Sequence, residues 1–302
     1  MSLACCLRVL AVIAAALLAS TAAAGAQPLV IGAISAKPSE EIAKFHPLAE
    51  HLAKRLGEFG VDRGKVVVLG SVAQLAELMR ARGADLMFDS PYPTLAVSEL
   101  AGSKVLLRRW KGGKASYRSL VLVRADSPIF SAKDLRGKVI GFEDNYSTSG
   151  YFLPAAALQA LGLTLREVRD PRTHVKADEV GYVFSDAYAN SLTWLLHGRI
   201  DAAGVGEHDY ERFLKHETAQ MRIVLETPNV PRNLVSVRAD LAPALVARIQ
   251  DSLLELQQTP EGKALLQALD GTTRFDALPA EAEQVLESMR RALRARSSSA
   301  TR

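Results

Sequence analysis

Residues 139–154 read VIGFEDNYSTSGYFLP and place an apolar strand, three hydroxyl side chains and a helix start in immediate succession. The strand is predicted at 139–142, and the hydroxyls belong to Ser147, Thr148 and Ser149. The first four N–H groups of a helix have no partner inside it, and they lie at the positive end of the helix dipole. These donors together predict a binding site for a small oxyanion, although serine and threonine also serve as ordinary helix caps.

Strand and helix signals alternate on both sides of this stretch, which is the pattern of an α/β protein with parallel strands. The predicted strands are 29–34, 65–69, 84–88, 104–109, 119–123, 139–142, 182–184, 201–205, 222–226 and 234–237. The predicted helices are 39–57, 72–82, 94–101, 187–198, 243–257, 260–269 and 279–296, besides the one that follows the hydroxyls and ends near residue 161.

A chain of 302 residues exceeds the usual size of a single hydrophobic core, so we expect two lobes. Residues 27–118 and 235–302 are predicted to form lobe I, and residues 119–234 are predicted to form lobe II. Strands near 119–123 and 234–237 are the predicted crossings between them. Because ligands of open α/β sheets bind at the carboxyl ends of strands, a cleft between the lobes would gather the polar residues that follow those strands.

The amino-terminal segment 1–26 has the composition of an export signal. Arg8 precedes an apolar run at 9–19, and Ala24-Gly25-Ala26 supplies a small-x-small cleavage pattern. A membrane anchor is the competing interpretation, because 9–26 has about enough residues to span a bilayer. The alanine-rich run and the small residues at its end favour cleavage before Gln27 and export to the periplasm.

Composition excludes several functions. Cys5 and Cys6 are the only cysteines and lie inside the predicted signal, so the remaining chain has no disulfide, thiolate metal site or cysteine nucleophile. The formal net charge of +4 is too small to argue for a nucleic-acid partner. We expect no metal and no cofactor.

Motifs for catalysis are missing as well. The sequence contains no G-x-S-x-G elbow, no P-loop, no H-E-x-x-H and no dinucleotide fingerprint after the first strand. We therefore expect a protein that is not an enzyme, with a serine hydrolase using Ser147 or Ser149 as the remote alternative. Residues 207–209 (Glu-His-Asp) are predicted to form a surface loop and not a metal site, because three adjacent residues rarely converge on one ion.

With these residues identified, the chain resembles the periplasmic phosphate-, phosphite- and phosphonate-binding proteins of ABC transporters. The segment 133–142 (KDLRGKVIGF), then STSG at 147–150 with Pro154, Leu158 and Gly162, is similar to a characteristic segment of that family. Supporting pieces are 84–92, 117–119 and GRIDAA at 198–203, and the resemblance spans about 29–269. It implies a two-lobed type II periplasmic binding protein fold with two hinge-crossing strands.

The resemblance also implies a ligand site. The hydroxyls and N–H groups of Ser147, Thr148 and Ser149 would hold the anion from lobe II, and Tyr92 would close on it from lobe I. Candidates nearby are Ser35 in the loop after the first strand, Tyr146 beside the hydroxyls, and Glu207 as a minor one. The chain departs from the family at Asp186, where many members have histidine. A carboxylate repels a dianion unless it accepts a proton or meets a cationic group, so the ligand could be protonated or carry an amine.

The function implied is capture of a phosphorus oxyanion in the cleft for an ABC permease, by a monomer that meets the membrane only through that partner. A sensor kinase could read the closed protein instead of a permease. A sulfonate or an amine-bearing compound is the alternative ligand. The sequence alone does not select among phosphate, phosphite and phosphonate.

Overall fold

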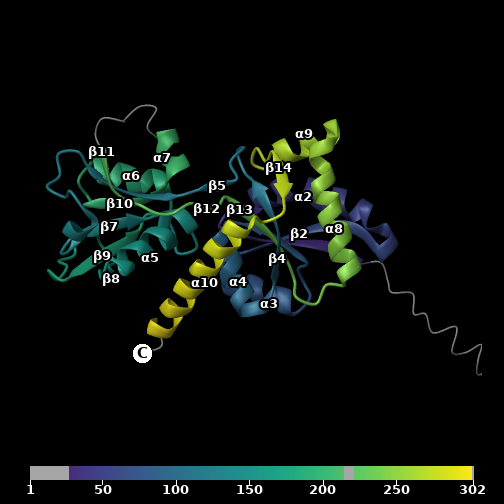
Figure 1. Ribbon diagram of the computed structural model, residues 1–302, viewed down its shortest axis with the longest axis horizontal. Coiled ribbons are helices and arrows are strands. Elements are labelled where there is room, and N and C mark those ends of the chain that lie inside the picture. The colour runs from purple at the N-terminus through teal and green to yellow at the C-terminus, as the bar shows by residue number, and fades with distance from the viewer. Residues whose placement is uncertain (1–26, 214–220, 301–302) are drawn as a thin grey trace, which may run out of the picture.

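The computed structural model describes residues 27–213 and 221–300, and the predicted signal lies outside them. Two six-stranded sheets lie side by side, each with helices around it (Figure 1). Among the described residues, no helix is long and apolar enough to cross a bilayer. We propose that the two sheets are the cores of lobe I (27–118 and 235–302) and lobe II (119–234).

The first sheet carries a parallel half and an antiparallel half. Its strands, in spatial order, are β14 (Arg274–Asp276), β4 (Lys104–Trp110), β13 (Asn233–Val237), β3 (Leu86–Asp89), β1 (Gln27–Ile34) and β2 (Val61–Leu69). β1 pairs in parallel with β2 and β3, whereas β13 runs antiparallel to β3 and β4. The accompanying helices are α2 (Pro38–Arg55), α3 (Val72–Arg80), α4 (Pro91–Ala101), α8 (Pro243–Glu255) and α9 (Pro260–Ala268).

The second sheet contains the strand that precedes the hydroxyls. Its strands, in spatial order, are β11 (Met221–Glu226), β6 (Ser119–Arg124), β10 (Ala202–Gly206), β7 (Val139–Phe142), β9 (Glu179–Phe184) and β8 (Thr164–Glu167). β7 lies in the middle and pairs in parallel with β9 and β10. Its helices are α5 (Leu153–Ala160), α6 (Tyr188–Leu196) and α7 (Glu207–Phe213). Parallel pairing brings the carboxyl ends of β7, β9 and β10 to the same edge.

A two-stranded ribbon connects the sheets. Its strands, β5 (Ser116–Tyr117) and β12 (Val230–Pro231), pair antiparallel between the two larger sheets (Figure 1). The strands expected at 119–123 and 234–237 each belong to one sheet, and the chain crosses between the sheets just before each of them, in this ribbon. The crossings therefore lie a few residues earlier than predicted.

The carboxyl-terminal helix α10 (Ala280–Ala300) extends from the first sheet toward α5 (Figure 1). Arg294 on α10 donates two hydrogen bonds to Glu99 on α4, at 2.8 and 2.9 Å. The Arg296 guanidinium donates to the phenol oxygen of Tyr151 and lies 4.8 Å from the centre of that ring. α10 thus contacts elements associated with both sheets.

Two local predictions were wrong. The helix expected to begin near Thr94 begins at Pro91, because proline is compatible with the first helical turn and Ser90 precedes it as the cap residue. Glu207, His208 and Asp209 form the first turn of α7 and not a surface loop. Acidic residues are favourable in that first turn, which the sequence reasoning did not weigh. The short strands β8 and β14 were not predicted, because only a few residues of each are apolar.

A close contact between α2 and β2 gives a direct test of the packing in the first sheet. A Cβ atom on Gly64 would lie 2.1 Å from the backbone carbonyl carbon of Ala49, which cannot move without shifting the helix. We expect Gly64→Ala to lower the free energy of unfolding by about 1–3 kcal/mol, the usual range for overpacking. Gly57→Ala is the matched control, because a Cβ there meets nothing within 4 Å. Urea titration of both variants would contradict this packing if their midpoints were equal.

Candidate functional site

The hydroxyl loop, defined as Ser147, Thr148 and Ser149, forms the start of a helical segment at the end of β7. Ser147 is the cap residue, and its Oγ accepts a hydrogen bond from the N–H of Gly150 at 2.9 Å. The turn 148–152 is π-helical, with the Phe152 N–H donating to the Ser147 carbonyl at 3.0 Å. The segment continues into α5. Helix-start N–H groups and side-chain hydroxyls are therefore concentrated here, as predicted for anion recognition.

Thr148 connects the two sheets. Its Oγ1 accepts a hydrogen bond from the backbone N–H of Tyr92 at 2.9 Å and donates one to the Ser90 hydroxyl at 2.8 Å. Ser90 and Tyr92 lie at the start of α4, which follows β3 of the first sheet. The Thr148 side chain is 1% exposed. The hydroxyl loop and the first turn of α4 thus meet directly at the junction of the two sheets.

Ser149 is fixed by residues from the ribbon and from β6. The Ser119 hydroxyl donates to the Ser149 carbonyl at 2.6 Å and also contacts the carbonyl of Val205. The Tyr117 phenol lies beside the side chains of Thr148 and Ser149, and burial raises the pKa of this phenol to about 12, which outweighs the lowering by these two side chains. Tyr117 is therefore a neutral hydrogen-bonding group beside the hydroxyl loop at physiological pH. The sequence reasoning did not identify it as a site residue.

The two predicted tyrosines lie near the loop in different ways. The ring of Tyr92 stacks on Phe152 with centroids 4.5 Å apart and an angle of 12° between the planes. Its contact with the hydroxyl loop is the backbone N–H bond to Thr148. Tyr146 packs against a hydrophobic cluster of the first sheet that includes Ile34. Although Tyr146 belongs to the loop that follows β7 of the second sheet, its ring therefore contacts residues of the first sheet.

The other predicted residues are more peripheral to the hydroxyl loop. Ser35 is half-buried after β1, where its Oγ accepts from the N–H of Lys37 at 3.0 Å. Asp186 is exposed after β9 with φ of 66°, and its charge helps to raise the pKa of Asp144. Glu207 lies 2.7 Å from the Arg118 guanidinium in an ion pair. These three flank the site from three strand ends, and no hydrogen bond joins their side chains to the hydroxyl loop.

Four acids that the sequence reasoning did not assign surround the loop. Burial raises the pKa of Asp89 to about 6 and that of Glu143 to about 7. Burial also raises the pKa values of Asp144 and Asp209. A Cβ on Gly206 would lie 2.8 Å from the Ser149 Oγ and 2.9 Å from an oxygen of Asp209, so these two side chains flank the same backbone atom. The site is thus rich in carboxyl groups that hold protons more tightly than usual.

Two basic residues, Arg232 and Lys111, lie in the segments that connect the two sheets. The Arg232 guanidinium lies 4.5 Å from the centre of the Tyr117 ring, and its charge opposes the raised pKa of Asp209. Burial lowers the pKa of Lys111, which pairs with Asp270 at 3.1 Å. Arg232 is the only charged residue of the segment 227–232, and that isolated charge is the sequence signal that could have identified it.

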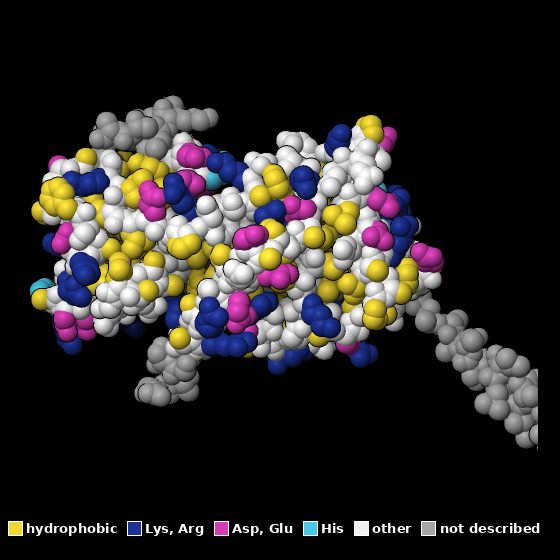
Figure 2. Space-filling model, in the orientation of Figure 1, with side chains coloured by type: hydrophobic (Ala, Val, Ile, Leu, Met, Phe, Trp, Pro, Cys, Tyr) yellow, Lys and Arg dark blue, Asp and Glu magenta, His cyan; other side chains and the backbone are white. Residues whose placement is uncertain are grey.

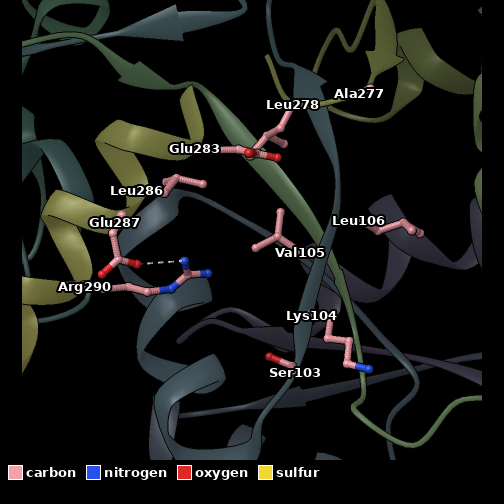
Figure 3. Close-up of a pocket in the computed structure, with 10 residues that line it drawn as sticks. All are labelled: Ser103, Lys104, Val105, Leu106, Ala277, Leu278, Glu283, Leu286, Glu287 and Arg290. Atoms are coloured by element: carbon pink, nitrogen blue, oxygen red, sulfur yellow. Dashed lines mark hydrogen bonds and ion pairs between the residues drawn. The ribbon is translucent and has the colours of Figure 1, made fainter. Parts of the chain in front are cut away.

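A cavity of about 620 Å³ lies between β4 and α10, lined by residues that include Lys104, Glu283 and Arg290 (Figure 3), and it contains none of the predicted ligand residues. On the face drawn in Figure 2, basic and acidic side chains are interspersed over both sheets. Across the part of the chain that the structure describes, no group of three or more His, Cys, Asp and Glu side chains could hold a metal ion.

Comparisons with known proteins identify the family to which the chain belongs. A family model described as the phosphonate periplasmic substrate-binding protein of ABC transporters matches residues 31–282. The chain is 30% identical to the phosphate-import protein PhnD of Mycolicibacterium smegmatis over 193 residues, which is 61% of this chain and 56% of that protein. It is 20% identical to the phosphonates-binding periplasmic protein of Escherichia coli over 250 residues, covering 80% of this chain and 70% of that one.

A solved structure extends the comparison over most of the fold. XAC2383 from Xanthomonas citri, bound to ATP, superposes with a TM-score of 0.83 at 26% sequence identity, covering 88% of this chain and 97% of that one. The same protein has also been solved with a chloride ion. PhnD1 from Prochlorococcus marinus, solved in complex with methylphosphonate, superposes with a TM-score of 0.63 at 18% identity, covering 88% of this chain and 98% of that one. The two-lobed type II binding fold expected from the sequence is thereby confirmed.

Proposed function

The chain belongs to the family of phosphonate periplasmic substrate-binding proteins of ABC transporters, and from this premise we propose that it captures a phosphorus oxyanion between its two lobes. Members of this family are solute-binding proteins and not enzymes. We propose the same for this chain, with residues 1–26 removed on export and the protein acting as a periplasmic monomer. Phosphate, phosphite and phosphonate are the proposed ligand class.

The observation that carries this proposal is the position of Thr148. Its hydroxyl bonds to both Ser90 and the Tyr92 N–H, so the hydroxyl loop of one lobe and a helix start of the other meet at one buried point. Two sets of N–H and hydroxyl donors converge there, and each donor counts for more in a water-poor site than at an open surface. Lobe closure around a small ligand is a common motion of hinged binding proteins. Ser147, Thr148, Ser149 and the Tyr92 N–H are the proposed anion contacts. On binding, the Thr148 hydroxyl would exchange its bond to Ser90, and the Tyr92 N–H its bond to Thr148, for bonds to the anion.

The acids of the site favour a second candidate ligand. Asp144, Asp209 and the exposed Asp186 place negative charge around the hydroxyl loop, which suits an ammonium group on the ligand. An aminoalkylphosphonate would satisfy both the donors and these acids. A sulfonate with an amine, such as taurine, is the corresponding alternative without phosphorus. A hydrolase that uses Ser147 stays a remote alternative.

A permease of the ABC type is the proposed partner, as the family implies. A sensor kinase is the alternative reader of the closed form. The two partners differ in the event that ligand binding triggers: uptake of ligand into the cell for a permease, and a change in kinase activity for a sensor. Ligand binding itself is the same event for either partner, so it is tested first.

A thermal-shift panel tests the proposed ligand class. We expect one member among phosphate, phosphite, alkylphosphonates and aminoalkylphosphonates to stabilise the purified protein by about 2.7 kcal/mol at 100 times its dissociation constant. ATP, sulfate and taurine complete the panel, ATP because XAC2383 was solved with it. A shift with taurine or sulfate alone would replace the phosphorus ligand by a sulfonate or sulfate. No shift with any phosphorus compound, for protein shown to be free of carried-over ligand, would contradict the proposal.

A further inference from the structure

The Ser147 hydroxyl already has both of its hydrogen-bonding roles filled inside the protein. Its oxygen accepts from the Gly150 N–H at 2.9 Å, and it donates its proton to Oε2 of Glu143 at 2.7 Å. A serine hydroxyl carries a single proton. While Glu143 is ionised, that proton is directed at the carboxylate, and the Ser147 side chain has none to donate to an anion.

Protonation of Glu143 reverses this arrangement without moving any heavy atom. A neutral carboxyl group can donate its own O–H to the Ser147 oxygen, which then accepts from both Glu143 and the Gly150 N–H. The Ser147 proton becomes available to a ligand. Resting on the proposed function, we propose that oxyanion binding at the hydroxyl loop is coupled to uptake of a proton by Glu143, a positioning residue that orients the Ser147 hydroxyl.

Local packing holds Glu143 in this position. A Cβ on Gly150 would lie 2.5 Å from the Cβ of Glu143 and 2.6 Å from its Oε2, so the absence of a side chain at 150 makes room for the carboxyl group. The backbone fixes the same residue twice: the Glu143 N–H donates to the Gly150 carbonyl at 3.0 Å, and the Glu143 carbonyl accepts from the Asp186 N–H at 2.8 Å. Glu143 is therefore held next to the hydroxyl loop by the helical segment that contains Gly150 and by the turn after β9.

The charges around Glu143 favour its protonated form. Burial is the largest effect that raises the pKa of this carboxyl group, and Asp144 beside it and Asp209 of α7 raise it further. The Ser147 hydroxyl and the N–H of Tyr188 at the start of α6 lower it, and the resulting pKa is about 7. An acid is protonated below its pKa, so the donor-ready form dominates below pH 7 and declines above it. A bound anion adds negative charge and favours protonation further.

The variant Glu143→Gln isolates this proton. A glutamine amide can donate to the Ser147 oxygen at every pH, as the protonated acid does. We expect the affinity of the wild type for phosphate, or for the phosphonate that the panel identifies, to fall relative to that of Glu143→Gln between pH 6 and 8.5. With a pKa of about 7, the ratio of the two affinities should change by about 30-fold. The ligand's own titration is common to both proteins and cancels in the ratio.

Two further variants make the result specific. Glu261→Gln removes an exposed carboxylate on α9 and should keep the wild-type pH profile. Ser147→Ala removes the hydroxyl through which Glu143 acts, so it should bind more weakly than the wild type. Its pH dependence should be shallower than that of the wild type, because only the direct repulsion between the Glu143 carboxylate and the anion remains. Ser147→Ala thus tests the proposal independently if Glu143→Gln does not fold.

Calorimetry in two buffers of different ionisation enthalpy supplies the second readout. At pH 8 the wild type should take up about one proton more per bound anion than Glu143→Gln, and Ser147→Ala should take up less than the wild type. Equal proton uptake and parallel pH profiles in the wild type and both variants would overturn the coupling and leave the proposed function intact. Failure of the wild type and of Glu143→Gln to bind any phosphorus oxyanion at any pH would overturn the proposed function itself.

Discussion

Replacing Thr148 by valine is expected to weaken binding of the phosphorus oxyanion by roughly 10- to 150-fold, the equivalent of about 1.5–3 kcal/mol for a hydrogen bond to a charged group. Valine has nearly the shape of threonine, so the change removes the hydroxyl and little else. The variant loses the Thr148 donor, which bonds to the Ser90 hydroxyl at 2.8 Å in the ligand-free protein and would turn to the anion on binding. Isothermal titration calorimetry with the best ligand of the panel measures the loss.

Thr193→Val is the control for this substitution. The Thr193 hydroxyl donates to the Ala189 carbonyl within α6, on the exposed face of that helix. Its replacement makes the same chemical change away from the hydroxyl loop and should leave the affinity unchanged. If Thr148→Val and Thr193→Val both bound as the wild type does, Thr148 would have no place among the anion contacts.

Replacing Arg109 by methionine is expected to lower the free energy of unfolding by about 3–5 kcal/mol, the usual result of removing one partner of a buried ionic network. Arg109 on β4 is 1% exposed. Its guanidinium donates to the Thr272 hydroxyl at 2.8 Å, the Leu269 carbonyl at 2.9 Å and Asp270 at 3.2 Å. Methionine fills similar space but leaves these buried oxygens without their donor. Thermal unfolding followed by circular dichroism measures the effect.

Asp270 links this network to the junction. Burial raises the pKa of this carboxyl group, but Lys111, Arg109 and Lys44 outweigh it and bring the pKa to about 2. Arg166→Met is the control, because Arg166 pairs with Glu179 with 43% of its side chain exposed, and exposed pairs contribute about 0–1 kcal/mol. Equal melting temperatures for the two variants would show that the Arg109 network contributes no more than a surface ion pair.

Local sequence patterns were sufficient for most of the fold. The alternation of apolar strands with amphipathic helices located β1, α2, β7 and α8 to within a few residues, because their burial patterns follow the period of each element. The same reasoning missed β8 and β14, where only Leu165 and Phe275 point to a strand. Edge strands bury less apolar surface than central ones, so their sequences carry a weaker signal.

Within the proposed site, local sequence patterns alone indicated only the contiguous part. Ser147, Thr148 and Ser149 adjoin one another in the sequence and indicate the start of a helix. Glu143 and Tyr117 become site residues through folding: the Glu143 carboxyl by lying under Gly150, and the Tyr117 phenol by lying next to Thr148 and Ser149. The spacing of these residues in the sequence does not predict that their side chains lie together in the fold. Asp186, which the sequence singles out as a departure from the family, lies exposed at a turn with positive φ, and its part in ligand binding stays a prediction.

The β5–β12 ribbon between the sheets restricts how the two lobes could move apart. Two unpaired linkers would let the lobes slide and twist independently, but the pairing of Val230 with Tyr117 and of Pro231 with Ser116 ties the linkers together. Any rotation of one lobe relative to the other would therefore take place about a single axis close to the ribbon. The hydroxyl loop lies near that axis, because the Ser149 carbonyl accepts a hydrogen bond from the hydroxyl of Ser119, two residues beyond Tyr117 in the ribbon. A modest angular swing would part the outer edges of the lobes widely while displacing the loop only slightly.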